Sequence, residues 1–413
     1  MGVIVQKFGG TSVANAERIH KACRRAIEAR DRGNKVVVVV SAMGDTTDDL
    51  LDLAHDVCTF EDRAYNPPKR ELDQLLATGE QVTIALMAMA LHALGAPAIS
   101  FTGGQIGLVT DDAFSKARIQ SINHQRILDE LNNGQIVIVA GFQGITPEGD
   151  FTTLGRGGSN ATLVALGAVL NADVCENYTD VDGIYTADPR IVKNARKIDK
   201  ISYDEMLELS SVGASVLQTR AVEFAKKYNV PIEVRNSQNN NPGTWIVAET
   251  PNMEHIVVSG VALKKELVRV LLKSVPDKPG VAANIFTTIA SAKIVVDDII
   301  QNTQEDNTAN VSFTVERGDL ADIKPIVEKL TKELGGNTQA SYQDGLAKVS
   351  AVGVGMRTHT GVAERMFKAL ADAKVNIQNI TTSEIKISCI ISAEQGPLAV
   401  QAVHDAFGLE KAP

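Results

Sequence analysis

Hydrophobic and polar residues follow two alternating patterns along the first 250 residues. Short runs of β-branched and other apolar residues, typical of buried strands, occupy residues 3–5, 36–40, 99–101, 136–140 and 174–176. Apolar residues at helical spacing occupy the intervening residues 16–29, 78–94, 115–132 and 160–170. Strands that alternate with helices predict an α/β fold, with a mostly parallel sheet sandwiched by helices.

Two polar turn segments end this pattern. Residues 236–243 read Asn-Ser-Gln-Asn-Asn-Asn-Pro-Gly, and residues 249–252 read Glu-Thr-Pro-Asn. Clusters of this kind mark loops and domain boundaries. We therefore predict a first domain over residues 1–250.

The remainder of the chain contains an internal repeat. Gly-Val-Ala at residues 280–282, followed by Phe286, recurs at residues 361–363, followed by Phe367. Each copy predicts a strand, a glycine turn, an amphipathic helix and a second strand. Two copies indicate a duplicated small α+β domain and not a solenoid, although chance similarity of two amphipathic helices is the alternative. The predicted domains cover residues 264–342 and 343–413.

Composition narrows the class of protein. The apolar fraction of 44% and the charged fraction of 22% are typical of a globular protein with a buried core. Aromatic residues make up only 4%, so the core must consist mainly of aliphatic side chains. The formal net charge is -9 and no block of basic residues is present, which argues against a nucleic-acid partner.

Three observations bear on location. The four cysteines form no C-x-x-C pair, which disfavours zinc and disulfides and favours the reducing cytoplasm. Residues 1–7 form a strand-like run and not a secretory leader. The most apolar helical segment, residues 84–94, is too short to span a bilayer and is followed by Gly95 and Pro97. We therefore expect a cytoplasmic protein with no membrane partner.

A lysine and two glycines follow the first predicted strand. Residues 5–13 read Val-Gln-Lys-Phe-Gly-Gly-Thr-Ser-Val, so the strand leads from Lys7 to the pair Gly9 and Gly10. Glycines let backbone N–H groups approach phosphate oxygens closely, and a helix N-terminus favours an anion. The order differs from the Walker motif, in which the lysine follows the glycines. A simple turn is the alternative interpretation.

Two later loops carry comparable signals. Residues 152–160 read Thr-Thr-Leu-Gly-Arg-Gly-Gly-Ser-Asn and precede a predicted helix. Arg156 offers a bidentate fork for a carboxylate, or is a surface arginine in a flexible loop. Residues 178–190 are rich in acidic and turn-forming residues and suit a ribose, a metal or phosphates, although turn chemistry alone explains them too.

Six segments, in this order, resemble the amino-acid-kinase superfamily and, within it, the aspartate kinases. They are residues 7–12, 39–47, 78–80, 140–144, 153–159 and 180–190. The repeat resembles the paired ACT domains of these enzymes, which are ferredoxin-like βαββαβ modules. The likeness extends over essentially the whole chain, and six motifs in order are highly specific where one would not be.

The resemblance implies ATP-dependent phosphorylation of the L-aspartate side-chain carboxylate, with Mg²⁺ as the cation. This reaction is the entry step to lysine, threonine and methionine synthesis. The acceptor carboxylate is already ionised at pH 7, so the reaction needs mainly positioning and charge neutralisation. A sister kinase acting on glutamate or acetylglutamate fits the ACT tail and the Thr-Gly-Glu motif less well.

The resemblance also implies a role for each matching residue. We assign no residue to a metal site, because the sequence leaves open whether protein carboxylates or only ATP hold Mg²⁺. The catalytic residues would be Lys7, Gly9, Gly10 and Asn160. The aspartate site would comprise Ser41, Thr47, Glu80, Arg156, Gly157 and Ser159, with Glu80 on the ammonium group and Arg156 on a carboxylate. The ATP site would comprise Lys7, Gly10, Thr179, Asp180, Tyr185, Asp188, Arg190 and Ser215. A lysine or threonine effector would contact Asp297, Gln301, Asn376 and Ile377.

Two residues depart from the pattern of the family's active site. Asn160 stands where an aspartate is usual, and Ser215 where a phosphate-binding lysine is usual. Losing one charge of each sign together avoids leaving an unpaired buried charge. The pair of changes predicts either a slow kinase or a catalytically degraded homologue that binds and regulates. The alternative is that Asn160 keeps the needed hydrogen bonds and another cation replaces residue 215.

The effector region departs as well. Val295 stands where an asparagine is usual, and Asp298 and Asn379 stand where apolar residues are usual. The two added polar groups could change which amino acid binds, although Asp298 on a solvated strand edge is the alternative. ACT domains usually pair across subunits, so we expect a homodimer. An internal start at Met253 would allow an α2β2 assembly.

Overall fold

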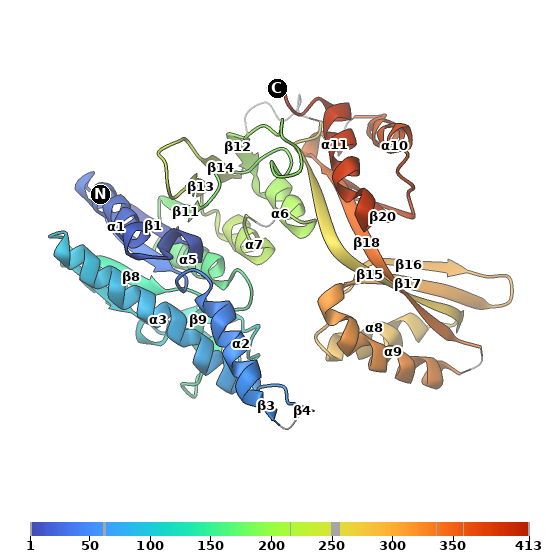
Figure 1. The fold of residues 1–413 in the computed structure, drawn as a ribbon, viewed down its shortest axis with the longest axis horizontal. Helices are drawn as coiled ribbons and strands as arrows, with labels where there is room; N and C mark the ends of the chain where they lie inside the picture. Colours follow the sequence, from blue (N-terminus) through green and yellow to red (C-terminus); the bar gives the residue numbers. More distant parts are fainter. Residues whose placement is uncertain are drawn as a thin grey trace. The chain divides into compact units, whose positions relative to one another are not determined.

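The computed structural model describes residues 2–60, 63–214, 216–248, 257–335, 337–357 and 359–411. They form two compact units, which are drawn together in Figure 1. Unit 1 comprises Met1–Tyr185, Lys197–Ser210 and Ser215–Asn252. Unit 2 comprises Thr186–Arg196, Ser211–Ala214 and Met253–Pro413.

An eight-stranded sheet forms the centre of unit 1, in the order β12-β14-β13-β11-β1-β2-β8-β5. Its central strands run parallel, and β14 pairs antiparallel to β13. The strands are β1 (Val3–Phe8), β2 (Lys35–Val40), β5 (Ala98–Phe101), β8 (Ile136–Ala140), β11 (Val174–Thr179), β12 (Lys200–Ser202), β13 (Ile232–Asn236) and β14 (Thr244–Val247). A smaller sheet holds β6 (Leu108–Thr110), β7 (Ile119–Ile122), β9 (Gln143–Ile145) and β10 (Phe151–Thr153), and a short hairpin holds β3 (Thr59–Phe60) and β4 (Arg63–Ala64).

Helices cover both faces of the large sheet (Figure 1). Helices α1 (Ala16–Asp31) and α3 (Lys69–Ala93) share one core cluster with alternate residues of the central strands, such as Val38 and Ile138. Helix α5 (Gly158–Val169) packs with α7 (Thr219–Tyr228), and α5 contacts β1 and β11. The remaining helices of this part of the chain are α2 (Thr46–Cys58), α4 (Gln125–Asn132) and α6 (Tyr203–Ser211).

The structure confirms the sandwiched α/β architecture and all five strands predicted for it. The predicted helix over residues 115–132 is wrong in its first half. Residues 119–122 form β7, which pairs antiparallel with β6, and the helix begins only at Gln125. The reason is the pairing of this segment with β6, and the Asp111 carboxylate stabilises the connection between the two strands by accepting hydrogen bonds from the backbone of Ala113 and Arg118.

Helix α3 is longer than the sequence pattern indicated. It has 25 residues, so by length and composition alone it could cross a membrane, which corrects the expectation drawn from residues 84–94. Ile84, Met87 and Leu91 are nevertheless buried in the core of unit 1. The helix therefore has the packing of a core helix within a folded domain.

Unit 2 contains two ferredoxin-like modules that share two long strands, β15 (Gly260–Pro276) and β18 (Gln339–Val352). Together they form one six-stranded sheet in the order β16-β17-β15-β18-β20-β19. The first module adds α8 (Val281–Ser291), β16 (Asp297–Thr303), β17 (Thr308–Glu316) and α9 (Leu320–Leu334). The second adds α10 (Val362–Asp372), β19 (Asn379–Thr382), β20 (Lys386–Ser392) and α11 (Gly396–Phe407), and Figure 1 shows α10 and α11 side by side.

A segment from the middle of the chain also belongs to unit 2. Ala187 and Val192 are buried in the core of the second module, and the Thr186 hydroxyl lies 3.0 Å from Nε2 of His404. The first strand of the second module's sheet, residues 260–264 of β15, precedes the first module in sequence. Because these units are not continuous in sequence, the predicted domain ranges 1–250, 264–342 and 343–413 stay a prediction.

Candidate active site

Lys7 lies at the carboxyl end of β1, where the strand meets the glycine turn. Only 9% of the residue is exposed, and its ammonium makes no hydrogen bond or ion pair within the described residues. Burial lowers the pKa of Lys7 to about 8, although the charge of Asp180 acts in the opposite direction. A side chain added at Gly9 would come within 3.4 Å of Nζ, so the glycine keeps the space beside the ammonium open. A buried cation without a partner is suited to an anionic ligand.

Gly10 brings the first glycine turn against the segment after β2. A Cβ atom there would lie 2.9 Å from the backbone oxygens of both Ala42 and Gly44. The N–H of Gly44 also donates to the Gly10 oxygen at 3.1 Å. Backbone atoms cannot move away at low energetic cost, so only glycine allows the two segments to lie this close together.

Glu80 reaches the same segment from α3. Its Oε1 accepts a hydrogen bond from the Ala42 N–H at 3.0 Å, and its Oε2 is buried with no partner among the described residues. The residue is 2% exposed, and burial raises the pKa of its carboxyl to about 8 despite the Ala42 hydrogen bond. A buried carboxylate that lacks a cation is suited to an ammonium group.

The second glycine loop leads into α5. Gly157 has φ of 70°, a left-handed conformation that favours glycine, and a Cβ there would lie 2.8 Å from that of Gln218. The Ser159 hydroxyl lies 2.9 Å from that of Ser41, which joins this loop to the end of β2. Asn160 is buried one residue further on, and its Oδ1 has no described partner.

Two predicted substrate residues lie at the margin of this arrangement. Arg156 is exposed and makes no hydrogen bond or ion pair with any described residue. Thr47 is half-buried near the start of α2. The structure thus brings Gly10, Glu80, Ser41 and Ser159 together through the segment at residues 41–44, and it leaves Arg156 available to a ligand.

Sequence reasoning missed Asp73, which holds the second loop in place. This fully buried carboxylate on α3 accepts hydrogen bonds from the backbone N–H groups of Ser115 and Thr153, at 2.8 and 2.7 Å. The Thr153 hydroxyl donates a third at 2.8 Å. Burial raises the pKa of Asp73 in spite of these donors. An acidic residue in an otherwise apolar helical stripe was the available signal.

The residues predicted to bind ATP are divided between the two units. In unit 1, Thr179 ends β11 and donates its hydroxyl to the carboxylate of exposed Asp180 at 3.0 Å, and half-buried Tyr185 forms a β-bridge with Lys197. Asp188 and Arg190 belong to unit 2, where they form an ion pair of 2.7 Å. Ser215 lies outside the described residues.

The predicted effector residues all lie in unit 2. Half-exposed Asp297 and exposed Gln301 are on β16, and the Gln301 amide donates to Asp277 at 3.5 Å. Asn376 is exposed and Ile377 packs against the core of the second module, just before β19. Within the described residues, no hydrogen bond joins one pair to the other.

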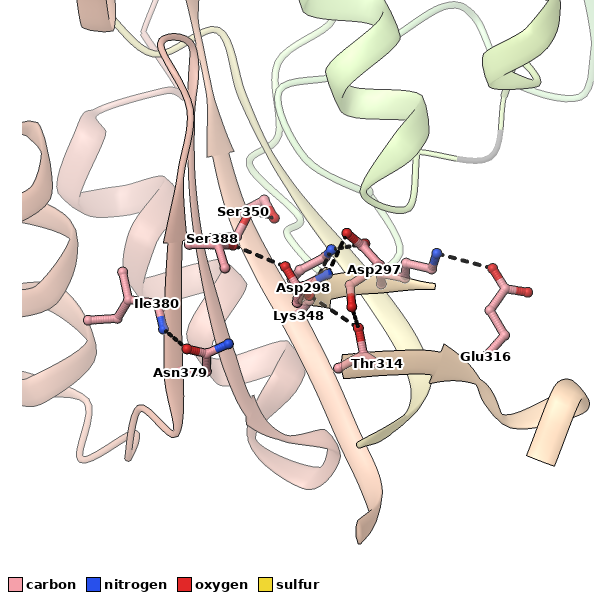
Figure 2. A network of polar contacts seen from close by, with 11 residues as sticks. Asp297, Asp298, Thr314, Glu316, Lys348, Ser350, Asn379, Ile380 and Ser388 are labelled. Carbon is pink, nitrogen blue, oxygen red and sulfur yellow. Dashed lines mark hydrogen bonds and ion pairs between the residues drawn. The ribbon is translucent and has the colours of Figure 1, made fainter. Parts of the chain in front are cut away.

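The three departures in this region behave differently. Val295 is exposed, and Asn379 accepts a hydrogen bond from the Ile380 N–H at 2.8 Å. Asp298 is buried, which excludes the alternative of a solvated strand edge. Figure 2 shows its partner, Lys348, which sequence reasoning also missed. A lone lysine within the apolar run of β18 was the signal.

Possible metal ligands are grouped at one place in the described part of the chain. Across the described residues, a single set of three side chains has its ligand atoms within 4.8 Å of one another, namely His404, Asp405 and Glu410. These residues lie in unit 2.

Comparison with family models covers most of the chain. Residues 2–236 match the amino acid kinase family. Residues 269–335 and 349–407 each match the ACT domain. The order of the three matches agrees with the two units of the structure.

Comparison with individual proteins gives full-length matches. The chain is 50% identical to the aspartate kinase of Pseudomonas fluorescens over 411 residues, which is 99% of this chain and 98% of that protein. It is also 50% identical to the aspartokinase of Geobacillus stearothermophilus over 409 residues, with the same coverage. These relatives are named as kinases, so the comparisons give no support to a catalytically degraded homologue.

Two solved structures of Escherichia coli aspartokinase III resemble this one at 26% identity. The R-state complex with aspartate and ADP gives a TM-score of 0.85, and the match covers 98% of this chain and 99% of that one. The T-state complex with lysine and aspartate gives 0.74 over the same shares.

Proposed function

Since the chain belongs to the aspartate kinases of the amino acid kinase family, we propose that the residues gathered in unit 1 transfer the γ-phosphoryl group of ATP to the side-chain carboxylate of L-aspartate. The product is 4-phospho-L-aspartate. The observation that carries the residue assignment is the pair of buried ionisable side chains of Lys7 and Glu80, each with hydrogen-bonding capacity left unused by the described residues. One is complementary to phosphate and the other to an ammonium group.

Lys7 acts on the transferring group. Its ammonium neutralises charge on the phosphates, and Gly9 and Gly10 present backbone N–H groups beside it. Thr179, Asp180 and Tyr185 hold the rest of the nucleotide at the ends of β11 and the loop that follows. Mg²⁺ bound with the nucleotide would offset the charge of its phosphates. Asp188, Arg190 and Ser215 remain predicted contributors to ATP binding.

Glu80 orients the acceptor by binding the ammonium group of aspartate. Arg156 takes a carboxylate of the substrate in a bidentate pair. Ser41, Ser159 and Thr47 add hydrogen bonds, and the backbone at Gly157 lets the loop approach closely. The side-chain carboxylate of aspartate needs no general base, because it is ionised at neutral pH. The protein's contribution is therefore alignment and charge neutralisation.

Asn160 occupies the start of α5 beside this substrate site. Its unpartnered amide oxygen is available to accept a hydrogen bond from an ammonium or hydroxyl group, as a carboxylate would, but without the charge. The expected consequence is a slow kinase, because removing one preorganised charge costs about 10²–10³ in rate. A rate in the ordinary kinase range of about 1–100 s⁻¹ would contradict this part of the proposal.

Unit 2 supplies the regulation. An end-product amino acid, lysine or threonine, binds at Asp297 and Gln301, and the E. coli complex with lysine supports lysine as the first candidate. Asn376 and Ile377 complete the site when ACT modules of two subunits pair in a homodimer. An α2β2 assembly from an internal start at Met253, which lies outside the described residues, is a further prediction. The enzyme acts in the cytoplasm, at the entry to amino-acid biosynthesis.

The test is ATP-dependent acyl phosphate formation, trapped with hydroxylamine. We expect hydroxamate from L-aspartate, and none above background from L-glutamate or N-acetyl-L-glutamate. Lys7→Ala should abolish the signal, and the exposed Lys293→Ala serves as a matched control with full activity. Hydroxamate from glutamate in preference to aspartate would overturn the substrate assignment.

A further inference from the structure

A buried lysine joins the two ACT modules of unit 2. Lys348 lies on β18, is 1% exposed, and forms ion pairs with both Asp297 and Asp298 (Figure 2). The distance from its Nζ to Oδ2 of Asp298 is 3.1 Å. A buried ammonium needs a counter-charge, because an unpaired one is strongly destabilising. The carboxylates of Asp297 and Asp298 thus both form ion pairs with the Lys348 ammonium.

A β-bulge lets two consecutive aspartates reach the same lysine. In a regular strand, Asp297 and Asp298 would point to opposite faces of the sheet. The pairing of β16 with β17 shifts between Asp297 and Ile300, and Asp298 has φ of 48°. Aspartate tolerates this left-handed conformation better than most residues. The bulge therefore turns the Asp298 carboxylate inward.

The two carboxylates are not equivalent. The Asp298 side chain is 4% exposed, and besides Lys348 it accepts a hydrogen bond from the Thr381 hydroxyl at 3.1 Å. The Thr314 hydroxyl lies 3.4 Å from it and donates to the nearer Asp297 backbone oxygen at 3.0 Å. The Asp297 side chain is 46% exposed. The Asp298 carboxylate is thus buried, whereas part of the Asp297 carboxylate is exposed to solvent.

The local charges do not balance. Lys348 faces two carboxylates. Nearby Lys264 is paired with Glu316 at 3.1 Å while its charge also acts on Asp297, so two lysines neutralise three carboxylates. Burial raises the pKa of Asp297, but its hydrogen bond and charge contact with Lys348 outweigh this, and the net shift is downward. Asp297 is therefore ionised at neutral pH. Its Oδ2 pairs with Lys348 and its Oδ1 accepts a hydrogen bond from the Asp298 N–H at 2.9 Å, but the side chain still has an exposed part that can take a further hydrogen bond.

We propose that Asp298 is a positioning residue for the effector: it keeps Lys348 neutralised, so that the exposed part of Asp297 can bind the amino group of an amino acid. Without Asp298, Lys348 would depend on Asp297 alone, and an incoming ammonium would have to compete with it. The inference rests on the proposed function, which puts the effector at Asp297. It adds the reason why a polar residue stands at position 298, where an apolar one is usual.

Isothermal titration of the full-length chain with L-lysine and L-threonine tests this. We expect Asp298→Asn to weaken binding of the effector about tenfold, the loss expected when a charged hydrogen-bonded partner is removed. Asp322→Asn, which changes an exposed aspartate on α9 of the same module, should leave the affinity unchanged.

The double variant Lys348→Met/Asp298→Met separates positioning from mere stability. It removes the competing ammonium together with its carboxylate, so we expect the affinity to return to within about threefold of the wild type. A double variant that binds as weakly as Asp298→Asn would overturn the inference, as would an Asp298→Asn variant of wild-type affinity. If the wild type binds neither amino acid, the proposed effector site itself fails, and the inference falls with it.

Discussion

The hydroxyl oxygens of Ser41 and Ser159 lie 2.9 Å apart, although 118 positions separate the two residues in the chain. This contact joins the end of β2 to the start of α5. It also brings the loop with Arg156 next to the segment that Glu80 contacts. The geometry of the proposed aspartate site therefore depends on a hydrogen bond between two elements, and neither sequence motif alone predicts this contact.

Replacing Ser159 should weaken aspartate binding selectively. We expect Ser159→Ala to raise the KM for aspartate about tenfold, because one hydrogen bond to a charged substrate and its pairing with Ser41 are lost. The KM for ATP should stay within about twofold of the wild type. Steady-state kinetics with each substrate varied in turn measures both, and Ser121→Ala, at an exposed position of β7, is the control. An equal rise in the two KM values would contradict the assignment of Ser159 to aspartate.

The raised pKa of Glu80 predicts pH-dependent binding of aspartate. The group has its pKa near 8 in the folded protein, against 4.5 ordinarily, so its contribution to stability decreases as pH rises from about 4.5 through 8. The ammonium of aspartate binds the ionised form, so affinity should increase with pH and level off above about 8. Titrations at pH 6.5, 7.5 and 8.5 test this, and Glu80→Gln should bind weakly at every pH. A flat wild-type profile would show that Glu80 does not bind the substrate.

Lys7 should limit activity on the alkaline side. Its pKa of about 8 means that the ammonium is lost above that pH in the free enzyme. The dependence of kcat/KM for aspartate on pH should therefore be bell-shaped, with a narrow maximum near 8. A plateau that extends to pH 10 would contradict a role for the Lys7 charge.

Asp73 should be a major stabilising residue of unit 1. Its three hydrogen bonds hold the segments at Ser115 and Thr153, so Asp73→Ala should lower the free energy of unfolding by about 3 kcal/mol. Urea unfolding measures the change, and Asp52→Ala, at an exposed position of α2, provides the baseline. A loss below about 0.5 kcal/mol would mean that solvent replaces these bonds without cost.

Much of the fold could be predicted from the sequence, since the apolar runs at residues 36–40 and 136–140 can be accommodated only in a buried sheet. Lys7, Gly9 and Gly10 were identified because a strand that ends with Lys7 and Phe8 is followed directly by two glycines. Residues 119–122 could not be assigned in this way. Their pairing with β6 is a tertiary contact that overrides the local helical spacing.

The polar network of unit 2 was less accessible to prediction. A regular strand would separate the side chains of Asp297 and Asp298, and only the bulge directs both to Lys348. Bulges depend on the pairing of two strands and leave no clear pattern in either one. Glu80, in contrast, was assigned from its motif, but its burial without a cation became visible only in the folded chain.

Turnover by the chain as it stands, with Asn160 and Ser215 in place, is the most direct test of the proposed kinase activity. The measurement is steady-state formation of aspartyl hydroxamate by the unmodified protein and by the double variant Asn160→Asp/Ser215→Lys. We predict a measurable rate that depends on Lys7 in the unmodified chain, and a rate about 10²-fold or more higher in the double variant. Turnover by the double variant alone would contradict the central claim, because unit 1 would then be a binding scaffold and not a catalyst.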